Sequence, residues 1–382
     1  MTEYNAVTAL SLRDCALTTL PDSLGQFINL QLLDVTGNQI TNLSESLKNL
    51  IHLKKLYLDD NQITVLPIWL GNLVDLEELH LDRNELTSLP EGISQLINLS
   101  ILNLYSNKLA TVPPVLGQLT GLKALSLGNN RLSTLPESLW QLTNLHILNV
   151  AENRLTALSE RIGNLTSLLT LDLGHNELTS LPDALGNLTN LTYFLYLSNN
   201  HLTSLPSSLT KLKNLRYLNV TDNHLAGLPA GIGELASLQE LRAYNNELTT
   251  LPESLGNLSN LLEIHVMHNK LESLPATLGQ LARLKELRLS DNRLNAFPES
   301  LGNLAHLRYL DLRNNRLTTL PESLGNLNNL TLLDLRGNRL RALPASIGEL
   351  ANLEKLDLRW NKLAAYPDWL QRLEERGCVV YT

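Results

Sequence analysis

The sequence predicts an α/β solenoid, a right-handed horseshoe in which a parallel β-sheet lines the concave side and short helical turns lie on the convex side. Three observations predict this fold class. The string Leu-x-Leu-x-x-Asn-x-Leu recurs along the whole chain of 382 residues. A proline follows most of the repeated asparagines at a fixed distance. Aromatic residues make up only 4% of the chain, so aliphatic side chains, chiefly leucine, have to fill the core.

The repeat is close to invariant in length. The interval from one repeated asparagine to the next is constant, except between Asn176 and Asn200, where it is one residue longer. Cys15 occupies the asparagine slot of a leading copy, which brings the number of copies to sixteen. The asparagines are Asn38, Asn61, Asn84, Asn107, Asn130, Asn153, Asn176, Asn200, Asn223, Asn246, Asn269, Asn292, Asn315, Asn338 and Asn361.

Each copy is expected to form one short strand and one outer turn. The Leu-x-Leu pair alternates with a period of two, which is typical of a strand with one face inward. A single copy cannot bury its leucines, so the copies have to stack and share a one-dimensional core. The asparagine side chain offers donors and an acceptor to backbone groups in the buried turn after the strand. The proline lacks a backbone N–H and therefore suits the start of the outer helical turn.

The full pattern, L-x-x-L-x-L-x-x-N-x-L-x-x-L-P-x-x-L-G, resembles leucine-rich repeats of the 23-residue Ras-group and bacterial type. The resemblance covers essentially the whole chain. It implies a scaffold that binds another protein on its concave face. Relatives of this group hold small GTPases, kinases or phosphatase subunits, so the resemblance implies partners of those classes.

We expect residues 1–382 to form a single solenoid, in which residues 367–382 supply a C-terminal capping helix and an edge strand. None of the catalytic motifs with a known spacing occurs, and the sequence therefore predicts no enzyme, no cofactor and no metal site. Two cysteines, no secretory signal and no long apolar run favour a cytoplasmic protein without a membrane anchor. The net charge of −8 argues against a nucleic-acid partner.

Partner binding should fall to the variable positions six, four, two and one before each asparagine and one after it, which we expect on the concave face or its rim. Three zones emerge: an acidic N-terminal zone, a middle zone with tyrosines, and an arginine-rich C-terminal zone. The predicted contact residues are Tyr57, Asp59, Asp82, Tyr105, Tyr196, Tyr217, Tyr244, Arg288, Arg313, Arg336, Arg359 and Trp360.

Several alternatives remain open at this level. Arg313, Arg336 and Arg359 stack beside a column of aspartates, so they form either a self-neutralising lattice or a docking patch for an acidic partner. The tyrosines either pad neighbouring strands or contact a partner. The whole chain could instead be a substrate-recognition module of a larger signalling or ligase protein, a phosphate or small-molecule sensor, or an idealised scaffold without an evolved partner.

Overall fold

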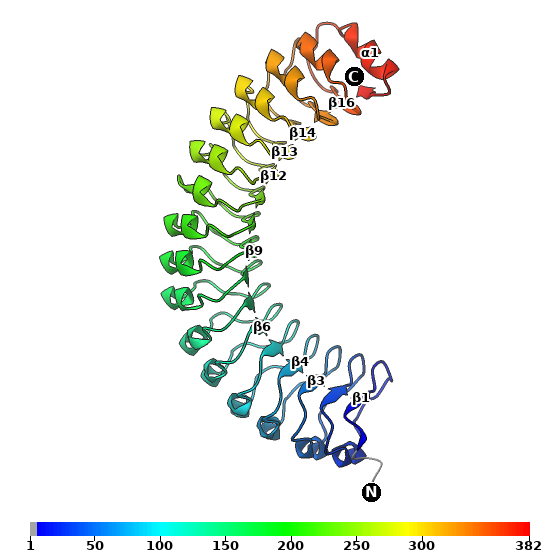
Figure 1. Cartoon of the computed structure of the whole chain (residues 1–382), viewed down its shortest axis with the longest axis vertical. Coiled ribbons are helices and arrows are strands. Elements are labelled where there is room, and N and C mark those ends of the chain that lie inside the picture. The colour runs from blue at the N-terminus through cyan, green and yellow to red at the C-terminus, as the bar shows by residue number, and fades with distance from the viewer. Residues whose placement is uncertain (1–5) are drawn as a thin grey trace. The chain divides into compact units, whose positions relative to one another are not determined.

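The computed structural model describes residues 6–382. The chain divides into two compact units, Met1–Leu191 and Thr192–Thr382, and the division falls within the one copy that carries an additional residue. In each unit, short strands succeed one another along the inner side, and short helical turns lie on the outer side (Figure 1).

Every strand has three residues, and its middle side chain is the inward-pointing leucine of the repeat or an equivalent aliphatic residue. The first unit contains β1 (Ala9–Ser11), β2 (Leu32–Asp34), β3 (Lys55–Tyr57), β4 (Glu78–His80), β5 (Ile101–Asn103), β6 (Ala124–Ser126), β7 (Ile147–Asn149) and β8 (Thr170–Asp172). The second unit contains β9 (Phe194–Tyr196), β10 (Tyr217–Asn219), β11 (Glu240–Arg242), β12 (Glu263–His265), β13 (Glu286–Arg288), β14 (Tyr309–Asp311), β15 (Leu332–Asp334), β16 (Lys355–Asp357) and β17 (Val379–Tyr381).

Within each unit, consecutive strands pair in parallel, and residues in the same slot of adjacent copies lie opposite each other. Leu33 of β2, for example, lies opposite Leu56 of β3. This register confirms the predicted parallel sheet, and it converts each slot of the repeat into a continuous column of side chains.

The outer turns are 3-10 helices of three to five residues. They are η2 (Asp22–Gln26), η3 (Glu45–Asn49), η4 (Ile68–Asn72), η5 (Glu91–Gln95), η6 (Pro114–Gln118), η7 (Glu137–Gln141), η8 (Glu160–Asn164), η9 (Asp183–Asn187), η10 (Ser207–Lys211), η11 (Ile232–Glu234), η12 (Glu253–Asn257), η13 (Ala276–Gln280), η14 (Glu299–Asn303), η15 (Glu322–Asn326) and η16 (Ala345–Glu349). In most copies the repeat proline precedes the helix, as its N-cap, and its carbonyl accepts the first helical hydrogen bond. In the two copies where Ser44 or Ser159 replaces proline, the serine carbonyl accepts the same bond, and the serine hydroxyl accepts a further backbone N–H of the turn.

Glycine in the turn lets neighbouring copies approach closely. A Cβ atom at Gly256 would lie 2.2 Å from the carbonyl oxygen of Thr277 in the next turn. No side chain can be accommodated at that distance without moving the two turns apart. This explains why eleven copies carry glycine in this slot.

The repeated asparagine performs the role expected from the sequence. The Nδ2 of Asn153 donates to the carbonyl of Leu127 in the preceding copy at 2.9 Å and to that of Val150 in its own copy at 3.1 Å. Its Oδ1 accepts the N–H of Leu132 in the preceding copy at 2.9 Å. The same pattern recurs within each unit, from Asn38 to Asn176 in the first and from Asn223 to Asn361 in the second. One buried amide therefore satisfies backbone groups of two copies at once.

At the C-terminus, residues 367–382 contain the one α-helix of the described chain, α1 (Trp369–Glu375), succeeded by β17, which pairs with β16. Trp369, Leu370 and Leu373 of α1 are buried. The predicted fold class, a leucine-rich solenoid with a parallel sheet and short outer helical turns, is confirmed by these elements.

We expect Asn153→Leu to lower the free energy of unfolding by about 1–3 kcal/mol, because it leaves buried backbone groups of two copies without partners. The exposed Asn144 donates a single hydrogen bond to the carbonyl of Thr120 and provides the control, since water can replace that bond in Asn144→Leu. Urea denaturation of both variants tests the difference, and equal losses would contradict the assigned role of the buried amide.

We expect Gly256→Ala to destabilise the protein by about 1–3 kcal/mol, because the added methyl group overlaps the Thr277 carbonyl. Gly227→Ala is the matched control in the same unit, since a Cβ atom there meets nothing within 4 Å. The melting temperatures of the two variants measure the effect. A Gly256→Ala protein as stable as the control would show that the turns are not in close contact.

Candidate binding surfaces

We call the strand face of a unit the surface made by the first and third residues of each strand and by the residue two positions beyond its end. In the first unit, Tyr57, Asp59 and Asp82 border a shallow hollow of about 300 Å³ on this face. The Tyr57 hydroxyl donates to Glu78 at 2.9 Å. Asp59 accepts the backbone N–H of Asp82 at 2.7 Å. Burial raises the pKa of both aspartates. The predicted acidic residues Asp59 and Asp82 therefore lie together, but the Asp59 carboxylate is already engaged in a hydrogen bond to the backbone of the next copy.

Tyr105 lies two residues beyond β5 and reaches across Gly128 in the next copy. Its hydroxyl donates to Glu152, two copies further on, at 2.9 Å. Its ring passes over Gly128, where a Cβ atom would lie 2.9 Å from the ring carbon Cδ2. A side chain at position 128 would collide with this ring, which accounts for the glycine there. Tyr105 therefore packs against the neighbouring copy as well as lying on the strand face.

In the second unit, Tyr196 and Tyr217 form an aromatic group with Phe194. The rings of Phe194 and Tyr196 are stacked at 5.5 Å, and those of Tyr196 and Tyr217 are 5.2 Å apart. The Arg242 guanidinium lies 5.5 Å from the centre of the Tyr217 ring. Burial raises the pKa of Tyr217 to about 12. Tyr244 lies two residues beyond β11 and is half-buried. The rings of Phe194, Tyr196 and Tyr217 pack against one another, while Phe194 remains exposed.

The four predicted contact arginines of the strand face are each paired with a carboxylate. Arg336 donates to both carboxylate oxygens of Asp334 and lies 3.3 Å from a carboxylate oxygen of Asp357. Arg359 donates to Asp357 at 2.6 Å. These contacts are those of the self-neutralising lattice. In the same column, Arg313 lies 3.7 Å from Asp311. Arg288 lies in the slot four before its asparagine, at the end of β13, and pairs with Glu286.

The aspartates of this lattice lie beneath the arginines. The side chain of Asp357 is 0% exposed and that of Asp334 is 7% exposed. Burial opposes the ionisation of Asp357, but hydrogen bonds from Arg359 and the charge of Arg336 outweigh it and hold the pKa of this carboxyl below its usual value. The arginines therefore stabilise the sheet, and this limits how freely they can serve a partner.

A second basic column has its arginines, but not its lysine, in the C-terminal zone predicted from the sequence, and none of its residues is among the predicted contact residues. It occupies the slot directly after the repeated asparagine and comprises Arg293, Arg316, Arg339 and Lys362. Each backbone N–H donates to a carbonyl of the preceding copy, which fixes the stacking of the column. All four side chains are exposed, and within residues 6–382 none of them forms an ion pair. We call this column the basic flank.

Trp360 lies at the end of the basic flank, two residues before Lys362. Its side chain is 71% exposed, and the Arg359 guanidinium lies 5.7 Å from its ring centre. Its backbone φ is +61°, in the left-handed region that bulky residues avoid. In the preceding copies of the unit this slot holds residues suited to that conformation, namely Asn199, Asp222, Asn245, His268, Asp291, Asn314 and Gly337.

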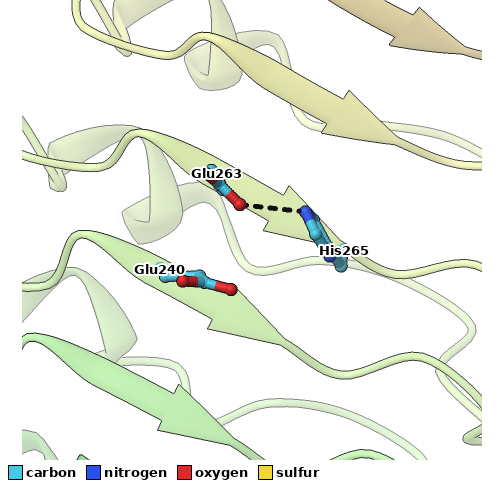
Figure 2. A group of neighbouring side chains, drawn as sticks. All are labelled: Glu240, Glu263 and His265. Atoms are coloured by element: carbon cyan, nitrogen blue, oxygen red, sulfur yellow. Dashed lines mark ion pairs between the residues drawn. The ribbon is translucent and has the colours of Figure 1, made fainter.

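A further cluster lies on the strand face of the second unit, where Glu240, Glu263 and His265 come together (Figure 2). Glu263 and His265 are the first and third residues of β12, and Glu240 lies opposite Glu263 on β11. One ligand atom from each lies within 4.8 Å of the others. Sequence reasoning concentrated on the slots four and two before the asparagine and missed this group. The cluster could have been found from the slot six before the asparagine, where three adjacent strands carry Glu240, Glu263 and Glu286.

Burial sets the protonation of this cluster. The His265 side chain is 8% exposed, and burial together with the charge of Arg288 lowers its pKa to about 4. Burial and the neighbouring carboxylates of Glu240 and Glu286 raise the pKa of Glu263. The imidazole is thus neutral at neutral pH, and its Nε2 atom is buried without a hydrogen-bond partner.

Family models of leucine-rich repeats match most of the chain. The model described as "Leucine rich repeat" matches residues 51–109, 74–132, 97–155 and 143–202, and "Leucine-rich repeat region" matches residues 203–298 and 295–375. A third leucine-rich repeat model matches residues 193–212. The chain belongs to the leucine-rich repeat family. Folds of this family are typical of protein–protein interaction modules.

Solved structures agree with this assignment. The leucine-rich repeat protein LIC12759 of Leptospira interrogans is 38% identical, with a TM-score of 0.90 over 100% of this chain and 97% of that protein. The Arabidopsis receptor kinase HAESA, solved in complex with the peptide hormone IDA and the co-receptor SERK1, is 28% identical. That match has a TM-score of 0.72 and covers 93% of this chain and 66% of HAESA. The plant peptide hormone receptor RGFR1, in complex with RGF2, is 26% identical, with a TM-score of 0.74 over 95% of this chain and 68% of that one.

A search of the curated proteins found no match. Within residues 6–382, none of the helices has both the length and the apolar character that a bilayer span requires.

We expect Arg336→Gln to lower the free energy of unfolding by about 1–3 kcal/mol at neutral pH, because the buried Asp334 and Asp357 lose a counterion. Arg316→Gln, in the exposed basic flank, is the control and should leave stability unchanged. Since ionised Asp357 contributes stability above the unfolded-state pKa of about 4, the deficit should shrink as the pH falls through that value. Thermal melts between pH 3 and pH 7 measure both effects, and an equal response of the two variants would contradict the lattice.

Proposed function

We propose that the protein is a non-enzymatic binding module and that its second unit captures an acidic segment of another protein on the basic flank and Trp360. Relatives with this fold bind polypeptides: HAESA was solved with a peptide hormone and a co-receptor, and RGFR1 with RGF2. These complexes support a protein or peptide as the class of partner. The choice of surface rests on the chain's own residues.

The exposed, strained Trp360 is the observation that carries the proposal. A tryptophan in the left-handed region costs conformational energy, and this one is too exposed for core packing to offset the cost. Tryptophan and arginine are the residue types most enriched among side chains that dominate binding energy at protein interfaces. Trp360, with Arg359 beside its ring, therefore suits a contact surface better than a stabilising role.

Charge supports an acidic partner. On the strand face, arginines are paired with aspartates, so their charge is already balanced. On the basic flank, adjacent copies place the backbones of like-charged residues roughly 5 Å apart, the spacing of neighbouring strands, so their side chains repel each other. In the last three copies, the segment between the repeated asparagine and the repeat proline, which contains the basic-flank residue, has no Asp or Glu that could neutralise these charges. A segment with several carboxylates would relieve this repulsion and would be steered toward the flank from a distance.

Of the contact residues predicted from the sequence, Trp360 belongs to the proposed surface, and Arg359, which pairs with Asp357, lies beside its ring. Tyr57, Asp59, Asp82, Tyr105, Tyr196, Tyr217, Tyr244, Arg288, Arg313 and Arg336 stay predictions for the strand face. The cytoplasmic location also stays part of the proposal, supported by the two free cysteines, of which Cys15 is exposed.

The triple variant Arg293→Glu, Arg316→Glu, Arg339→Glu should lose its partner, because it reverses the charge of the flank without touching the lattice. The matched control is Arg131→Glu, Arg154→Glu, which changes exposed arginines of the same slot in the first unit. Affinity capture from the native cell extract, quantified by mass spectrometry for wild type and both variants, measures the difference. The proposal expects a protein captured by the wild type and the control but reduced at least tenfold with the triple variant.

Trp360→Asn provides a second arm of the same experiment. Asparagine tolerates the left-handed backbone, so this variant should melt at the same or a higher temperature than wild type, yet bind the captured protein at least tenfold more weakly. Capture that is unchanged in both the triple variant and Trp360→Asn would refute the proposed surface. The identity of the captured protein then decides between the small GTPase, kinase and phosphatase classes that the family resemblance implies.

A further inference from the structure

Three adjacent strands of the second unit carry a pattern that is interrupted in the middle. β11 and β13 read Glu-Leu-Arg, whereas β12 reads Glu-Ile-His. In the outer two strands, the arginine pairs with the glutamate two residues before it, as Arg242 does with Glu240. In β12, His265 takes the place of the arginine, and its Nε2 atom forms no hydrogen bond with Glu263.

His265 has an unsatisfied ligand atom that faces this glutamate. Its Nε2 is 3.3 Å from a carboxylate oxygen of Glu263 and 3.9 Å from one of Glu286 on β13. The ring is more than nine-tenths buried, and Nε2 has no hydrogen-bond partner. A buried polar atom without a hydrogen bond destabilises the fold, so a bound ligand at Nε2 would explain its position. The lone pair of a neutral imidazole is also a common ligand of transition metals in proteins.

We propose that Glu240, Glu263 and His265 bind a divalent transition-metal ion of the zinc class. This site is independent of the basic flank and goes beyond the proposed protein binding.

The geometry fits such an ion. Zinc lies about 2.0–2.1 Å from histidine nitrogen and about 2.0–2.2 Å from carboxylate oxygen, so two ligands of a tetrahedral site are about 3.3–3.4 Å apart. The separation between His265 Nε2 and the Glu263 oxygen is 3.3 Å. Glu240 faces the same space from the neighbouring strand (Figure 2). The Glu263 side chain is 37% exposed, which leaves an open side for water or for a ligand atom of a partner.

The surrounding charges set the strength of the site. Arg242 and Arg288 flank the cluster and repel a cation, while Glu240, Glu263 and Glu286 attract it. Three carboxylates, two guanidinium groups and a neutral imidazole leave one negative charge in excess. A divalent ion is therefore favoured by the ligands but opposed by the arginines, and we expect micromolar rather than tighter binding.

Calorimetric titration of the intact, tag-free chain with zinc chloride at pH 7.5 tests the proposal, and titration with cobalt chloride adds a visible absorption band that reports coordination directly. We expect one equivalent to bind with a micromolar dissociation constant. His265→Gln and Glu263→Gln should each weaken binding by tenfold or more. His268→Gln is the matched control, because His268 lies in the same copy but faces Asp291 at 3.6 Å.

Two further measurements keep the outcomes distinct. The His201→Gln, His224→Gln variant removes a stacked histidine pair in the same unit and should leave the titration unchanged, which excludes binding by that pair. The half-exposed Glu263→Gln change does not disturb the core, so loss of binding there cannot be attributed to unfolding when circular dichroism is unchanged. Binding weaker than 100 µM in the wild type, or equal binding in wild type, His265→Gln and Glu263→Gln, would overturn the site.

Discussion

The buried amide of the repeated asparagine is the interaction on which the rest of the structure depends. After each strand the chain turns inside the core, and its backbone groups there have no access to water. The asparagine Nδ2 donates to carbonyls of its own and of the preceding copy, and its Oδ1 accepts an N–H of the preceding copy. One side chain bonds to backbone groups of two copies, so the two copies have to stay in a fixed offset. This requirement favours copies of constant length.

A fixed spacing has an electrostatic consequence, because a charged residue kept in one slot becomes a column of like charges. On the strand face, Asp334 and Asp357 lie two residues before Arg336 and Arg359, and the period of two places them on the same side, where they pair. In the basic flank, the residues two positions before Arg316 and Arg339 are an asparagine and a glycine, and the column keeps its charge. Position within the repeat thus separates arginines that stabilise the sheet from arginines available to a partner.

The sequence predicts the features that periodicity dictates and leaves open those that depend on side-chain conformation. The parallel strands, the asparagine ladder and the columns all result from the constant repeat length. The reach of Tyr105 over Gly128 to Glu152 does not, because it spans 47 residues and depends on a tyrosine rotamer. Likewise, the sequence left open whether Arg336 forms an ion pair with an aspartate or is free, since both arrangements are compatible with the same sequence. The neutral state of His265 depends on burial beside Arg288, which spacing alone does not reveal.

Stability and function are assigned to different slots in this chain. The leucine, asparagine and glycine slots are constrained by packing, by buried hydrogen bonds and by the close approach of neighbouring turns. In the remaining slots, neighbouring copies tend to carry residues of the same kind. Two residues of the second unit differ from their neighbours in a way that does not stabilise the fold. Trp360 replaces residues that tolerate a left-handed backbone, and His265 replaces an arginine that would neutralise Glu263. Both departures cost stability and leave an exposed ring or an unpaired nitrogen, which is why the two proposed sites are placed there.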